Sequence, residues 1–318
     1  MQPSLIVILG PTASGKTALG IEVAQKIGGE VISADSRQIY RELNIGAAKP
    51  YLSSPFRRGD GGEVIIDGIP HHLVDIVNPD QSYSVADYQR DAMRVIADIH
   101  ARRKVPVIVG GTGLYIQAVV DQLYIPKIPE DKTLRASLAQ SIAARGIDAL
   151  YLDLLKRDPA AKDVVQSKNP RRVIRALEVC MKTGEPFTSF LKKGNLPFPV
   201  FQIGIEWPRL ELNERINRRV DEMMAAGLLD EVRSLGAKYG WELPSMSGHG
   251  YRQLGMHLRG ELSLDVAVTL TKQETRQYAK RQMTWFKRDP RIQWFPRGEG
   301  ALDMVQEVLK QKAPLLSG

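Results

Sequence analysis

A segment near the start of the chain has the composition of a phosphate-binding loop. It follows the apolar run Leu5–Leu9 and reads Gly10-Pro11-Thr12-Ala13-Ser14-Gly15-Lys16-Thr17, which fits the pattern G-x-x-x-x-G-K-[ST]. Glycines allow main-chain amides to converge on phosphate oxygens at the start of a helix, Lys16 adds a positive charge, and the Thr17 hydroxyl is placed to bind Mg²⁺. The motif therefore predicts that a di- or triphosphate group binds here.

The motif does not identify the compound that carries the phosphates. A nucleoside triphosphate is the commonest ligand of such loops, but a diphosphate leaving group on another substrate presents the same oxygens. A glycine-rich turn that binds nothing is the third interpretation. The strand before the loop and the helical pattern after it, residues 18–27, argue against that interpretation.

Two other segments follow predicted strands and are expected at the same edge of a sheet. Asp35-Ser36-Arg37-Gln38 comes after the run Val31–Ala34, and Gly110-Gly111-Thr112-Gly113 comes after Val105–Val109. The carboxyl ends of parallel strands face the ligand crevice of an α/β sheet, which makes Asp35 a candidate site residue. Taken singly, an Asx turn at Asp35 and a tight turn at the glycines explain these segments equally well. Together with the phosphate loop they predict a cleft.

The elements that position these segments alternate in type along the first third of the chain. Short apolar runs at 5–9, 31–34, 73–77 and 105–109 read as strands. Between the last two lies a helix that Ser84 and Asp87 open as a capping box. This alternation predicts an α/β fold, with a parallel sheet core of the phosphate-loop type flanked by helices.

The periodicity changes from about Tyr124 onward. Residues 134–183 show helical spacing without a strand run, and a strand pattern returns at Val200–Ile205. We therefore predict a catalytic core of residues 1–123 and 198–318 and a helical insertion domain of residues 124–197. The stretch Ser53–Gly62 reads as an exposed loop and receives no function.

Composition places the chain among folded proteins of a reducing compartment. Of its 318 residues, 43% are hydrophobic and 25% charged, and the formal net charge of +8 suits a polyanionic partner without requiring one. The single cysteine, Cys180, excludes an intramolecular disulfide and a multi-cysteine zinc site, and we expect it in the core.

His71 and His72 are adjacent in a strand, point to opposite faces, and are interpreted as structural. No run is long enough to span a membrane, so we expect a cytoplasmic protein without membrane contact.

Six motifs in one order resemble the bacterial tRNA dimethylallyltransferases. They are G-P-T-A-S-G-K-T, A-D-S-x-Q-x-Y, A-K-P, a Tyr-Ser-x-x-D-Tyr helix start, G-G-T-x-L-Y and Gly250-Tyr251-Arg252-Gln253. The resemblance extends over nearly the whole chain, whereas phosphate-loop kinases share only the first motif. Ala47 stands where the family usually has Thr, and the 53–62 loop is longer than expected. The zinc finger of eukaryotic relatives is absent, because one cysteine cannot form it.

The resemblance implies a prenyl transfer. A dimethylallyl group passes from dimethylallyl diphosphate to N6 of adenine 37 in the anticodon loop of tRNAs that read codons beginning with uridine, which gives N6-(dimethylallyl)adenosine and diphosphate. In this interpretation Asp35 is the general base that takes the N6 proton, while Thr17 with Mg²⁺ and Arg219 stabilise the departing diphosphate. Arg215 lies four residues from Arg219 on the same helix face.

The resemblance also implies a set of tRNA contacts. Ser36 and Gln38 are expected to hydrogen-bond the target base, and basic residues at the start of a helix in the insertion to meet backbone phosphates of the anticodon stem-loop. The implied positions are Asp35, Ser36, Arg37, Gln38, Thr112, Arg135, Arg171, Arg172, Val173, Ile174, Arg175, Gly250, Tyr251, Arg252 and Gln253. A solvated helix face is the alternative for the basic cluster. The aromatic residues Tyr278, Trp285 and Phe286 of a later helix are interpreted as core residues. The protein is expected to be a monomer.

Three rival functions remain open at this stage. An isopentenyltransferase acting on free adenine nucleotides would use the same donor chemistry without a basic insertion. A small-molecule kinase would use the phosphate loop for a nucleoside triphosphate. An RNA-binding protein that is switched by a nucleotide would bind the nucleotide and the RNA without forming a product.

Overall fold

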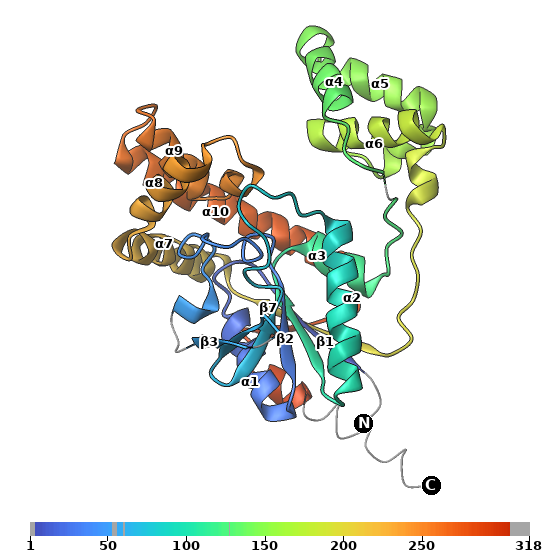
Figure 1. Ribbon diagram of the computed structural model, residues 1–318. Coiled ribbons are helices and arrows are strands. Elements are labelled where there is room, and N and C mark those ends of the chain that lie inside the picture. The colour runs from blue at the N-terminus through green and yellow to red at the C-terminus, as the bar shows by residue number, and fades with distance from the viewer. Residues whose placement is uncertain (1–3, 53–55, 60, 127, 306–318) are drawn as a thin grey trace. The chain divides into compact units, whose positions relative to one another are not determined.

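The computed structural model describes residues 4–52, 56–59, 61–126 and 128–305. It divides the chain into two compact units (Figure 1). The core unit consists of Met1–Val120 and Leu196–Gly318, and the helical unit consists of Asp121–Asn195.

One eight-stranded sheet forms the centre of the core unit, in the order β3-β4-β5-β2-β6-β1-β7-β8. All neighbours from β5 to β8 are parallel, while β3, β4 and β5 pair antiparallel at one edge. The strands are β1 Leu5–Leu9, β2 Glu30–Ala34, β3 Phe56–Arg58, β4 Val64–Ile66, β5 Ile69–His72, β6 Pro106–Gly110, β7 Val200–Glu206 and β8 Ile292–Pro296. The α/β fold predicted from the sequence is confirmed.

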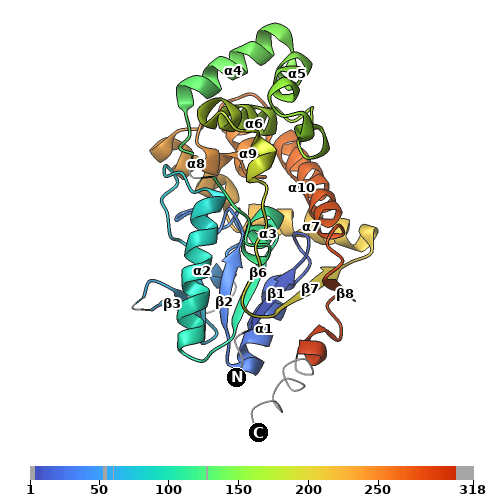
Figure 2. The same ribbon diagram turned by 90° about the vertical axis from the view of Figure 1, so that its right-hand side faces the viewer.

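Helices cover both faces of this sheet, because side chains alternate along each strand. Leu5, Val7 and Leu9 of β1 pack in one core with residues of α2 and α3, whereas Ile6 and Ile8 pack with residues of α1. Figure 2 shows these helices beside the sheet. The helices of the core unit are α1 Lys16–Ile27, α2 Val85–Ala101, α3 Gly113–Val120, α7 Arg209–Ala225, α8 Leu228–Tyr239, α9 Tyr251–Leu258 and α10 Leu264–Phe286, with short 3₁₀ turns at η1 Pro50–Leu52 and η4 Pro244–Ser247. The Ser84 capping box of α2 is present as predicted.

The third predicted strand was placed wrongly. The chain is extended at Ile69–His72, and the apolar run 73–77 after it is not a strand. Leu73 and Asp75 have positive φ values of 59° and 57°, which lie outside the β region. Leu73 and Val74 are nevertheless buried. The apolar run 73–77 therefore reflects burial of a turn, not an extended strand.

The segment predicted as an exposed loop contains part of a hairpin. Phe56–Arg58 pairs antiparallel with Val64–Ile66 at the edge of the sheet, and residues 53–55 and 60 lie outside the described residues. Arg58 donates to the Asp75 carboxylate at 2.7 Å, and Asp75 also forms a buried ion pair with Lys49. This ionic contact fixes the hairpin to the turn after β5.

The helical unit has a small core of its own. Its elements are α4 Lys132–Arg145, α5 Ile147–Arg157, η2 Pro159–Asp163, α6 Pro170–Thr183 and η3 Phe187–Phe190. Leu138, Leu150, Leu154 and Leu177 pack together at its centre, and Cys180 is buried with them as expected. Asp131 caps α4, and Asn169 before Pro170 caps α6, which explains where these helices begin.

Within the described residues, no helix is long and apolar enough to cross a bilayer.

The two histidines interpreted as structural have partners inside the sheet region. His71 Nδ1 lies 2.9 Å from the Ile69 carbonyl, and His72 Nε2 lies 2.7 Å from a Glu30 carboxylate oxygen.

Candidate active site

The predicted phosphate-binding loop joins β1 to α1 and is held from outside by two side chains of the β7–α7 segment. Arg215 Nε donates to the Ala13 carbonyl at 2.8 Å, and Trp207 Nε1 donates to the Ser14 carbonyl at 2.9 Å. The Arg215 guanidinium also stacks over the Trp207 ring, 4.2 Å from its centroid. Ala13 and Gly15 have φ values of 62° and 91°, so these contacts support a left-handed turn that exposes the first amides of α1.

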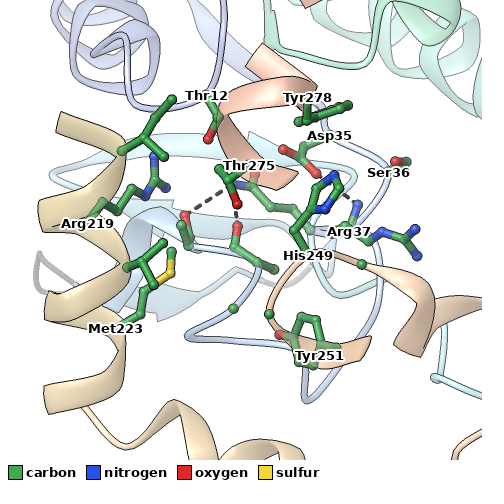
Figure 3. A pocket seen from close by; sticks show the side chains of 18 of the residues that line it. Thr12, Asp35, Ser36, Arg37, Arg219, Met223, His249, Tyr251, Thr275 and Tyr278 are labelled. Carbon is green, nitrogen blue, oxygen red and sulfur yellow. Dashed lines mark hydrogen bonds between the residues drawn. The ribbon is translucent and has the colours of Figure 1, made fainter. Parts of the chain in front are cut away.

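The residues that the sequence assigned to chemistry meet around one cavity of about 230 Å³. Asp35 and Arg219 project into it from opposite sides (Figure 3). The predicted site residues that line it are Thr12, Lys16, Thr17, Asp35, Ser36, Arg37, Gln38, Arg219, Gly250 and Tyr251. The carboxyl ends of β1 and β2 and the face of α7 supply most of this wall, as expected for an open parallel sheet.

Two of the cations that line the cavity, Lys16 and Arg219, are partly buried. Burial, with a further contribution from Arg219, lowers the pKa of the Lys16 ammonium to about 8, and Asp35 acts in the opposite direction. Burial likewise lowers the pKa of the Arg219 guanidinium, again opposed by Asp35. A cavity lined by three partly buried cations, Lys16, Arg37 and Arg219, and by the single carboxylate of Asp35 is electrostatically suited to an anion.

Asp35 is fixed by its own turn. Its Oδ1 accepts the Arg37 main-chain N–H at 2.8 Å, and the Thr112 hydroxyl accepts the Ser36 N–H at 3.0 Å. The first of these bonds is the Asx turn that the sequence left as an alternative. Because the carboxylate also lines the cavity, the turn orients Asp35 and does not exclude a chemical role.

A mixed wall of α7 provides apolar surface next to the charges. Ile216, Val220 and Met223 line the cavity together with Arg219, at spacings of three and four along one helix face. Leu228 at the start of α8 continues this surface. One helix therefore presents a guanidinium and an apolar strip to the same space.

The sequence predicted Gly250 and Tyr251 at the start of α9 but missed the other residues that the α9 and α10 region contributes to the wall. Thr275, Tyr278 and Gln282 of α10 line the cavity, and so does His249, which precedes α9. The His249 and Tyr278 rings lie 5.2 Å apart, and burial, followed by Asp35, raises the pKa of Tyr278 to about 12. The aromatic residues of α10 were expected in the core; Phe286 is, but Tyr278 faces the site.

Several predicted RNA contacts of the core unit have partners inside the protein. Arg37 donates to the carbonyls of Pro244 and Ser245, and Gln38 donates to the Ala48 carbonyl at 3.2 Å. The buried Tyr251 hydroxyl donates to Glu231 at 2.7 Å. Gln253 is buried as well, and Arg252 pairs with Glu274. Arg37, Gln38 and Tyr251 line the cavity, and contact of all five side chains with RNA stays a prediction.

The basic residues of the helical unit divide in the same way. Arg135 and Arg175 both pair with the buried Glu178 carboxylate, at 2.8 and 2.5 Å. Val173 is fully buried and Ile174 is partly buried against the same core. Arg171 and Arg172 are exposed at the start of α6. The part of this set that solvent reaches is therefore smaller than the sequence predicted.

Comparison with known proteins identifies the family. The family model described as IPP transferase matches residues 38–289, and one described as isopentenyl transferase matches residues 3–55. This chain belongs to the IPP transferase family. The family predicted from the motifs is thus confirmed, and the enzyme class with it.

Relatives of similar length support the assignment. The chain is 43% identical to a tRNA dimethylallyltransferase of Carboxydothermus hydrogenoformans over 98% of both chains, and 46% identical to one of Pelotomaculum thermopropionicum over 91% and 90%. The crystal structure of a tRNA isopentenylpyrophosphate transferase from Bacillus halodurans superimposes with a TM-score of 0.69 at 37% identity, covering 98% of this chain and 97% of that one. A eukaryotic dimethylallyltransferase acting on tRNA gives a TM-score of 0.75 at 28% identity, over 96% and 77%.

Proposed function

We propose that this protein transfers a dimethylallyl group from dimethylallyl diphosphate to N6 of adenine 37 in the anticodon loop of tRNA. The observation that carries the proposal is the single cavity in which the Asp35 carboxylate faces Lys16, Thr17 and Arg219. A base for the acceptor and an anion site for the leaving group are both required by this reaction. The names of the most similar relatives support the same reaction.

On the donor side, the bond between carbon and the bridging oxygen breaks and the diphosphate leaves with the electron pair. Negative charge therefore grows on the oxygens that face the phosphate-binding loop. Lys16, Arg219 and the first amides of α1 lie at this cavity, where they would stabilise the growing charge. The apolar strip of Ile216, Val220 and Met223 gives the dimethylallyl carbons a surface beside the cations.

A magnesium ion fits the residues present. The Thr17 hydroxyl at the start of α1 would hold it, and the ion would supply further neutralisation of the leaving group. The described residues contain no group of three or more acidic, His or Cys side chains that could bind a metal. Mg²⁺ usually keeps several water ligands and takes others from substrate phosphates, so the Thr17 hydroxyl would add to ligands that the diphosphate and water supply. The buried Ser14 hydroxyl, which has no hydrogen-bond partner within the described part of the chain, offers a further polar atom at the loop.

On the acceptor side, N6 forms the new bond to carbon and loses a proton. Asp35 is placed to receive that proton, because its Asx turn and the contact between Thr112 and Ser36 hold it at the edge of the cavity. The adenine must leave its stack to reach this position. The neighbouring rings of His249 and Tyr278 offer a surface on which the extruded base can stack.

The tRNA is the proposed macromolecular partner, and the protein acts as a cytoplasmic monomer on one anticodon loop at a time. The formal net charge of +8 favours binding to a polyanion. The helical unit is the proposed contact for the anticodon stem-loop. Within the basic cluster of that unit, Arg171 and Arg172 are the exposed arginines that can meet a phosphate without breaking an ion pair with Glu178.

Transfer of label from radioactive dimethylallyl diphosphate tests this function. The protein is incubated with Mg²⁺ and either unmodified tRNA, the same tRNA with guanine at position 37, or AMP. We expect label in the first tRNA alone. Label in AMP would select an enzyme of free nucleotides, and phosphate transfer from ATP without prenyl transfer would select a kinase. Binding of both substrates without any product would select a switch protein.

A further inference from the structure

One amide side chain joins the two glycine-rich loops of the site. Gln282 of α10 is buried, and its Oε1 accepts the main-chain N–H of Thr12 at 2.9 Å. Its Nε2 donates to the Gly111 carbonyl at 2.8 Å. Thr12 belongs to the phosphate-binding loop after β1, and Gly111 to the loop after the neighbouring strand β6. The fit is close, because a Cβ added at Gly111 would clash with the Gln282 amide nitrogen.

The bridge continues to the proposed base. Thr112 follows Gly111 and its hydroxyl accepts the N–H of Ser36, the residue after Asp35. A short series of hydrogen bonds thus runs from the loop that would hold the diphosphate, through Gln282, to the turn that holds the carboxylate. The diphosphate and the Asp35 carboxylate must lie at a fixed separation if the N6 atom is to attack the dimethylallyl carbon as the diphosphate leaves.

Each loop also has supports that do not involve Gln282. Arg215 and Trp207 hold the carbonyls of Ala13 and Ser14 in the phosphate-binding loop. The Thr112 N–H donates to the Ala34 carbonyl at 3.1 Å on the other side. Removing the Gln282 amide should therefore preserve the shape of each loop and release the constraint between them.

We propose that Gln282 is a positioning residue that sets the spacing between the diphosphate site and Asp35. The proposal rests on the prenyl transfer proposed above. It predicts that the two substrates bind independently of Gln282, whereas the step that joins them depends on it. A residue that only fastens α10 to the sheet would instead affect folding and binding.

The test compares Gln282→Met, which keeps the length but loses both hydrogen bonds, with Gln282→Glu. The glutamate can still accept from the Thr12 N–H, but it turns an oxygen toward the Gly111 carbonyl. Gln273→Met is the matched control, because Gln273 is exposed on the same helix. For each variant we measure the melting temperature, the Kd of a non-hydrolysable donor analogue, the Kd of an anticodon stem-loop, and the single-turnover rate with both substrates saturating.

We expect Gln282→Met and Gln282→Glu to react about 10- to 100-fold more slowly than the parent, because small misplacement of reacting groups has effects of that size. Both dissociation constants should stay within about threefold, and Gln273→Met should match the parent. A saturated rate within twofold of the parent in Gln282→Met, full recovery in Gln282→Glu, or a defect confined to binding of either substrate would each overturn the proposal. If Gln282→Met does not fold, Gln282→Glu decides alone. Absence of product with the parent protein would instead overturn the prenyl transfer itself.

Discussion

The Asp35 carboxylate raises the pKa of the Lys16 ammonium, while burial and the Arg219 guanidinium lower it. The lowering effects prevail, and the pKa of Lys16 falls to about 8. The cavity is also lined by three basic side chains, Lys16, Arg37 and Arg219, and by one carboxylate, Asp35, so it holds more positive charge than that carboxylate balances. A bound anion such as the proposed diphosphate would supply the missing negative charge.

The first prediction concerns the pH dependence of donor binding. Because the pKa of Lys16 is about 8, the ammonium is charged below that pH and loses its proton as the pH rises through it. We expect the Kd of a dimethylallyl diphosphate analogue to increase about tenfold between pH 7 and pH 9.5, with the midpoint near 8. Calorimetric titration at constant ionic strength measures it.

Lys16→Arg is the control for this titration, because a guanidinium keeps its charge across the range. The Kd of Lys16→Arg for the analogue can differ from that of the parent, but it should be nearly independent of pH between 7 and 9.5. An equally steep pH dependence in Lys16→Arg would assign the effect to another group.

The second prediction concerns the proposed base. Asp35→Asn keeps an oxygen that can accept the Arg37 N–H, so the turn should persist while the carboxylate charge is lost. We expect the single-turnover rate to fall by about 10²–10⁴-fold, the usual contribution of a positioned general base. Asp80→Asn, at an exposed position, serves as the control. A rate for Asp35→Asn close to that of the parent would show that the N6 proton leaves by another route.

The third prediction compares two adjacent arginines of α7. Arg219 faces the cavity, whereas Arg218 is exposed and lies 3.8 Å from Glu222. We expect Arg219→Ala to lower the rate about 10²–10³-fold, since it removes a fixed positive charge from the leaving group. Arg218→Ala should change the rate less than about twofold, as most exposed substitutions do. Steady-state rates of the two purified variants make the comparison, and equal effects would contradict the assignment of Arg219.

The parts of the site that the sequence predicted are those carried by contiguous segments. Residues 10–17 contain the whole phosphate-binding pattern, and Asp35 follows a buried strand whose end must lie at the same edge. His249 and Gln282 had no such signal. They are more than 200 residues along the chain from the loop, and only the packing of α9 and α10 brings them to it.

The errors in the fold have a common physical cause. A hydrophobic run reports burial, and it reports conformation only when its length and periodicity agree. The run Leu73–Val77 is buried but contains a left-handed Leu73 and Asp75, so its apolar pattern imitated a strand. The edge strand Phe56–Arg58 has the opposite character, because it is exposed and carries two arginines, as edge strands often do.

The fourth prediction separates structural from RNA-binding arginines in the helical unit. Glu178 is buried, and its carboxylate accepts the Asp131 N–H and pairs with Arg135 and Arg175. Burial alone would raise the pKa of Glu178, but Arg135, the Asp131 amide and Arg175 together hold that pKa below its ordinary value of 4.5. The two ion pairs of Glu178 therefore stabilise the fold above pH 4.5. This contribution is lost as the pH falls through the folded-state pKa of Glu178.

We accordingly expect Glu178→Gln to lower the free energy of unfolding at pH 7 by about 2–4 kcal/mol, because it leaves two arginines with a neutral partner. The variant should also lose part of the acid destabilisation seen in the parent. Asp148→Asn removes an exposed partner of Lys168 and should change the free energy by less than about 1 kcal/mol. Urea unfolding at pH 7 and pH 4 measures both. If Glu178→Gln is as stable as the parent, the ion pairs of Glu178 with Arg135 and Arg175 do not contribute measurably to the stability of the fold.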